Sequence, residues 1–120
     1  MSEANFLPGI TQRRVVTDRL EISGLEAGPT AGVPVVLVDG NVSSSAFFQE
    51  LMLKLANEGG YHVYAPDLRG FGDSQVLPVD ATRGVKDFSD DLASFVQTLE
   101  LSQFHLLGWS LGGNIVLQYI

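Results

Sequence analysis

The stretch Gly108-Trp109-Ser110-Leu111-Gly112, followed by Gly113, decides the fold of this chain. An apolar run at 104–107 precedes it and predicts a short strand, and a helical pattern begins at Leu111. Between a strand and a helix, G-x-S-x-G is typical of a sharp, strained turn that lifts a serine hydroxyl out of the carboxyl end of a sheet. The pattern therefore predicts a nucleophile elbow with Ser110 as the nucleophile.

The glycines on either side of the serine have a steric explanation. Side chains at Gly108 and Gly112 would collide with neighbouring backbone in so tight a turn. A dinucleotide-binding loop needs G-x-G-x-x-G, whereas the spacing here is G-x-x-x-G-G, and the loop containing Gly70 and Gly72 lacks a third glycine. A plain tight turn with no chemistry remains the alternative to the elbow.

Upstream of the elbow, strand and helix patterns alternate. Apolar runs predict an opening ribbon of two antiparallel strands, then buried strands, with amphipathic helices between them. The expected strands are 13–17, 20–23, 35–38, 61–66 and 104–107, and the expected helices are 45–60, 88–99 and from 111 onward. Residues 24–34 are expected to form a loose connection. Such alternation predicts an α/β fold with a mostly parallel sheet and helices on both faces.

Composition narrows the classes of partner and cofactor. The 120 residues carry a net charge of −7 and no cysteine, so we expect no nucleic-acid partner, no disulfide and no thiolate metal site. Its start does not resemble a secretory signal, and its apolar runs are far shorter than the roughly 20 residues that span a bilayer. We expect a soluble, cytoplasmic protein with no membrane partner.

Three motifs, in order, resemble the α/β-hydrolase superfamily over nearly the whole chain. Val35-Val-Leu-Val-Asp-Gly-Asn resembles the strand and loop that supply an oxyanion-hole amide, 65–74 resembles the D-x-R-G-x-G-x-S segment, and 108–112 is the elbow. The resemblance implies that the oxyanion donors are the backbone N–H groups of Asn41 and Leu111. It also implies a single incomplete domain, 1–120, corresponding to the N-terminal half of an α/β-hydrolase fold.

One position departs from the family pattern, since Asp39-Gly40 stands where the family usually has His-Gly. An ionised Asp39 pointing inward would oppose a developing oxyanion and would have a raised pKa. Our expectation is instead that Asp39 faces away and accepts hydrogen bonds from loop amides. Arg69 and Asp73 are expected to hold their own loop together, and Trp109 either lines an acyl pocket or simply packs.

The triad of this family follows the chain order serine, acid, histidine. After Ser110 come only Leu-Gly-Gly-Asn-Ile-Val-Leu-Gln-Tyr-Ile, with neither acid nor histidine. His105 lies about 16 Å before Ser110 along its strand, and His62 begins a parallel strand at the opposite sheet edge, so both are expected to be structural. The last helix ends at Ile120 without a capping residue, and we expect it to be cut in mid-helix.

The resemblance implies a serine hydrolase that cleaves a small-molecule ester, lactone or amide through an acyl-serine, with no metal or organic cofactor. It also implies that this chain alone is inactive. The alternatives are a non-catalytic hydrolase-like binding module, an inactive fragment and, from another class, a flavodoxin-like nucleotide binder. Because the elbow strand would have an unpaired edge, the expected protein partner is either a C-terminal half of the fold or a second copy through that edge.

Overall fold

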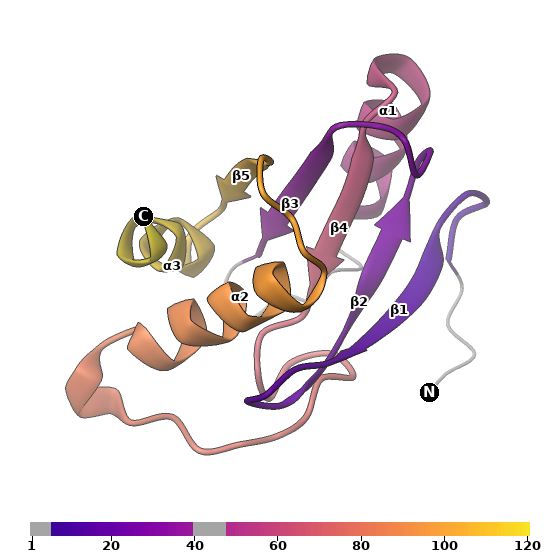
Figure 1. Ribbon diagram of the computed structural model, residues 1–120. Coiled ribbons are helices and arrows are strands. Elements are labelled where there is room, and N and C mark those ends of the chain that lie inside the picture. Colours follow the sequence, from indigo (N-terminus) through magenta and orange to yellow (C-terminus); the bar gives the residue numbers. More distant parts are fainter. Residues whose placement is uncertain (1–5, 40–47) are drawn as a thin grey trace.

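The computed structural model describes residues 6–39 and 48–120. Within these ranges the strands form one sheet in the order β1-β2-β4-β3-β5 (Figure 1). Their bounds are β1 (Thr11–Val16), β2 (Glu21–Ala27), β3 (Pro34–Val38), β4 (His62–Pro66) and β5 (His105–Gly108). Strand β2 runs antiparallel to β1 and β4, whereas β3 is parallel to both β4 and β5. The antiparallel opening ribbon and the parallel centre confirm the predicted fold class.

Helices cover both faces of the sheet. Helix α1 (Gln49–Gly59) packs on one face, while α2 (Lys86–Thr98) and α3 (Leu111–Tyr119) pack on the other. A short 3-10 turn, η2 (Ala81–Arg83), precedes α2. Residues of β3 alternate between the faces: Val35 and Leu37 join the α1 side, and Val36 and Val38 join the α2–α3 side. This explains why 35–38 is a continuous apolar run.

The predicted end of the first helix at its glycine pair is confirmed. Gly60 has φ +70°, and its N–H donates to Ala56 O while Tyr61 N–H donates to Leu55 O. Glycine adopts this left-handed conformation without steric cost, which is why the helix ends there. The chain then turns directly into β4.

The expectation of a loose connection over 24–34 is wrong in its first part. Strand β2 continues to Ala27 and pairs with β4, with Gly24 opposite Pro66 and Ala27 opposite Val63. A Cβ at Gly24 would lie 2.6 Å from Ala65 O. The glycine that looked like a strand breaker instead allows β2 and β4 to approach closely.

Strand β5 is less buried than its apolar sequence predicted. Among the described residues it pairs only with β3, and the side chains of His105 and Leu107 are exposed. Leu107 retains 43% of its accessible surface. An edge strand has unpaired backbone groups on one side and less cover on its faces, which accounts for the difference.

Candidate functional site

Ser110 occupies the turn between β5 and α3 in a strained conformation. Its φ is 59° and its ψ is −124°, and Glu100 is the only other described non-glycine residue with positive φ. A side chain held in such a region costs of order 1–3 kcal/mol, so the surrounding structure must impose it. Ser110 is exposed at the carboxyl end of the sheet, immediately before the first turn of a helix.

Close backbone contacts explain two of the three glycines around the serine. A Cβ at Gly108 would lie 2.3 Å from Gly112 O, and a Cβ at Gly112 would lie 2.1 Å from Val38 O. The nearest atom to a Cβ at Gly113 is Gly108 O, at 3.9 Å. The turn therefore requires glycine at 108 and 112, the two positions of the G-x-S-x-G pattern, but not at 113.

One hydrogen bond joins this turn to strand β3, and two more lie within the turn. Trp109 N–H donates to Val38 O at 3.0 Å, Gly112 N–H donates to Trp109 O at 2.9 Å, and Gly113 N–H donates to Ser110 O at 2.9 Å. Leu111 is the first residue of α3, so its N–H lies in the turn whose donors lack an intrahelical acceptor. The N-terminus of a helix also carries partial positive charge, which favours an anion beside it.

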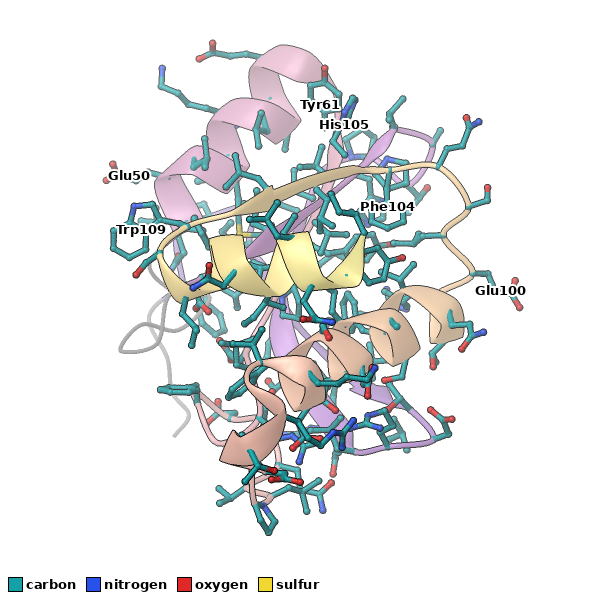
Figure 2. The ribbon with its side chains drawn as sticks, turned by 90° about the vertical axis from the view of Figure 1, so that its left-hand side faces the viewer. Glu50, Tyr61, Glu100, Phe104, His105 and Trp109 are labelled. Carbon is teal, nitrogen blue, oxygen red and sulfur yellow. The ribbon has the colours of Figure 1, made fainter. Side chains whose placement is uncertain are left out.

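The other expected oxyanion donor, Asn41, lies outside the described residues. Trp109 is 48% exposed and points outward from the junction of β5 and α3 (Figure 2). Its ring is therefore not simply packed in the core of the described structure.

Asp39 follows β3 directly and is completely buried, at 0% exposure. Neither of its carboxylate oxygens has a hydrogen-bond partner of normal geometry among the described residues. The expected hydrogen bonds to loop amides are thus not found among the described residues, and the loop that follows Asp39, residues 40–47, lies outside them. Burial first, and then the charge of Asp67, raises the pKa of Asp39 from 3.8 to about 7, with its own backbone amide opposing the rise.

The proximity of Asp39 and Asp67 was not anticipated, because it depends on which strands are neighbours in the sheet. Each aspartate comes directly after a strand, β3 or β4, and these two strands are parallel neighbours. Carboxyl ends of adjacent parallel strands meet at the same edge of a sheet. Asp67 is buried at 6% exposure, and its carboxylate packs against Gly72.

The two histidines lie away from the serine. His62 begins β4 opposite Pro34, at the other end of the sheet, where it contacts the Glu26 carboxylate and stacks on Tyr64. His105 begins β5 and meets the ring of Tyr61 edge-on, at the opposite end of this strand from Trp109 (Figure 2). Neither imidazole is placed to serve as the base for Ser110.

Arg69 and Asp73 have structural roles, as expected, but they tie the loop after β4 mainly to other elements rather than to itself. The Arg69 guanidinium donates to both carboxylate oxygens of Asp91 in α2, at 2.7 and 2.8 Å, and to Pro78 O. The hydrogen bond to Asp91 raises the pKa of Arg69 further, so it stays charged. Asp73 accepts a hydrogen bond from Gln12 at 3.0 Å.

Comparison with known proteins identifies the family. A sequence model described as "alpha/beta hydrolase fold" matches residues 33–120. The chain belongs to the α/β-hydrolase family. It is 34% identical over 110 residues to the 2-hydroxy-6-oxo-2,4-heptadienoate hydrolase of Pseudomonas putida, covering 89% of this chain and 38% of that protein.

Solved structures of α/β hydrolases share the fold described above. Epoxide hydrolase VrEH1 from Vigna radiata superposes with a TM-score of 0.84 at 22% identity, covering 96% of this chain and 37% of that one. A membrane phospholipase A described as a bacterial virulence factor superposes with a TM-score of 0.82 at 32% identity, covering 92% of this chain and 35% of that one. The chain thus spans less than two fifths of these three relatives.

Neither a metal-binding cluster nor a membrane-spanning helix is found among the described residues. No cluster of three or more His, Cys, Asp or Glu side chains is arranged there to hold a metal ion. None of the helices in 6–39 and 48–120 combines the length and apolar character needed to cross a bilayer.

Proposed function

We propose that this α/β-hydrolase chain carries the nucleophile of a serine hydrolase that cleaves a small-molecule ester, lactone or amide. The observation that carries the proposal is the conformation of Ser110: an exposed serine with φ of 59° on a turn that two glycines make possible. Such strain persists only when the surrounding structure imposes it, and it is concentrated at working sites. A plain turn could use glycine at position 110 at no conformational cost.

In the proposed reaction the Ser110 hydroxyl attacks the carbonyl carbon and loses its proton to a general base. The negative charge that develops on the carbonyl oxygen is held by the N–H of Leu111 and, by resemblance, that of Asn41. The leaving group takes up a proton, and water then releases the acyl group from Ser110. The N-terminus of α3 adds a favourable field at the developing charge.

The base and the acid that orients it are proposed to come from residues outside this chain. No described histidine reaches Ser110, and losing the base of a comparable serine enzyme costs on the order of 10⁶ in turnover. The 120 residues alone should therefore have almost no hydrolytic activity.

Fluorophosphonate labelling tests this proposal. The probe is applied to this chain, to the chain extended by whatever coding sequence follows it, and to the Ser110→Ala variant of the extended form. We expect strong labelling of the extended form only, lost in Ser110→Ala. Folded protein that stays unlabelled in every form would contradict a serine hydrolase.

A non-catalytic binding module is the second candidate, and one observation favours it. Asp39 has a buried, unpartnered carboxyl, and its main chain contacts Gly112 of the turn that would hold the oxyanion; an ionised group close to a developing oxyanion would oppose catalysis. An unlabelled but folded extended chain that binds a small ester or its acid product would support this candidate.

A further inference from the structure

Asp39 is a buried ionisable group that the proposed reaction does not use. Its side chain has no accessible surface, and neither oxygen has a hydrogen-bond partner among the described residues. An isolated carboxylate cannot remain charged in such a place, because burying an unpaired charge costs far more than burying a neutral group. Asp39 can be accommodated where it lies only as the neutral acid.

The charged groups around Asp39 also favour its neutral form. Asp67, from the segment after β4, is the described charged group whose field acts on Asp39, and it is also negative. The elbow residues 108–112, which pack on the end of β3, contain no titratable side chain, and Glu50 in the first turn of α1 is exposed. Of these surroundings, none supplies a cation to Asp39.

The main chain of Asp39 is in contact with the elbow. Gly112 lies so close that a Cβ there would be 2.6 Å from Asp39 O and 2.1 Å from Val38 O. The adjoining Val38 O also accepts the hydrogen bond from Trp109 N–H. Trp109, before Ser110, and Gly112, after it, are therefore both in contact with the main-chain carbonyls of Val38 and Asp39.

From this arrangement we propose that Asp39 is a positioning residue that keeps Ser110 in its strained, reactive conformation only while the Asp39 carboxyl is protonated. Loss of the proton forces the carboxylate toward water, and the main chain at 38–39 moves with it. Trp109 and Gly112 then lose their contacts with the carbonyls of Val38 and Asp39, and Ser110 relaxes from the elbow conformation. The inference rests on the proposed function of Ser110.

The raised pKa of Asp39, about 7, places this switch near neutral pH. Below pH 7 the acid is neutral and the elbow is supported. Above it the ionised fraction grows, and the reactive fraction of the enzyme falls about tenfold per pH unit once most molecules are ionised. Asparagine at position 39 has the same shape but cannot ionise, so it should hold the elbow at every pH.

The test compares the rate of Ser110 labelling by a fluorophosphonate between pH 5.5 and 9 in the extended wild-type chain and its Asp39→Asn variant. We expect a ratio of variant to wild-type rates near one at pH 6, rising to about 100-fold at pH 9. Asp73→Asn is the matched control, because it makes the same substitution at an exposed carboxylate that is hydrogen-bonded to Gln12. Its profile should follow that of the wild type.

Far-UV circular dichroism at each pH separates positioning from mere stability. If the wild type unfolds over the same pH range in which its labelling falls, Asp39 is a stability determinant and the inference is overturned. Equal pH profiles for wild type and Asp39→Asn would overturn the inference alone. No labelling of either folded protein at any pH would overturn the proposed function as well.

Discussion

Replacing Gly112 by alanine is the sharpest test of how the elbow is built. The new Cβ would lie 2.1 Å from Val38 O, whereas real Cβ atoms essentially never come within 3.0 Å of another atom, so the backbones must separate by about 0.9 Å. The obstacle is the backbone of strand β3, which pairs on both sides with β4 and β5 and cannot move aside as a flexible side chain could. We expect the free energy of unfolding to fall by about 3 kcal/mol, the upper part of the usual range for overpacking.

Gly113→Ala is the matched control for this substitution. It adds the same methyl group one residue later in α3, where the nearest atom is 3.9 Å away. Because alanine favours a helix over glycine, this variant should be more stable by up to about 1 kcal/mol. Urea denaturation followed by far-UV circular dichroism measures both. If the two variants differed by less than about 0.5 kcal/mol, the steric account of the elbow would be refuted.

Further predictions concern three aspartates and the serine. Asp91→Ala leaves the Arg69 guanidinium buried without its carboxylate and should lower the free energy of unfolding by about 3–5 kcal/mol. The control Asp90→Ala removes a more exposed carboxylate and should lower it by under about 1 kcal/mol. Thermal and urea denaturation compare the two variants. The pKa of Asp39 is higher in the folded protein, about 7, than its unfolded value of 3.8, so the free energy of unfolding should fall as pH rises from about 4 to 7, by about 4 kcal/mol in total. Asp39→Asn should abolish this fall, which urea titrations across that pH range measure. Ser110→Gly relieves a strained φ that Ser110→Ala keeps, so the glycine variant should be about 1 kcal/mol the more stable by calorimetry; equal stabilities would argue against strain.

Most of the fold could be predicted from the sequence because its signals are local. Apolar runs mark the parallel strands, helical periodicity marks α2, and the glycine pair marks the end of α1. Strand β2 was predicted too short because Gly24 is a strand breaker by propensity. Its true role depends on the approach of β4, a contact between residues more than forty positions apart, which no local pattern reports.

Those parts of the candidate site that depend on local sequence could also be predicted. The G-x-S-x-G spacing indicated both the turn and the glycines that the contacts require, and the composition of the loop after β4 indicated the structural role of Arg69. The burial of Asp39 was missed, because the identity of a residue does not reveal whether neighbouring segments enclose it. Placing Asp39 and Asp67 together required the strand order, which the sequence pattern leaves open.

The exposed edge strand shows a different limit. An apolar run of four or five residues predicts a strand but does not tell how much of it the surrounding chain covers. Leu107 and Trp109 keep nearly half of their accessible surface, although both are large apolar residues in or beside this run.

The most direct measurement for the central claim is the site of the covalent adduct on the protein. The extended chain is treated at pH 6 with a fluorophosphonate, digested, and mapped by tandem mass spectrometry. We predict one modified residue, Ser110, in the peptide that spans the turn from β5 to α3. A stable adduct on a different serine, with Ser110 unmodified in folded protein, would contradict the assignment of the nucleophile and the mechanism built on it.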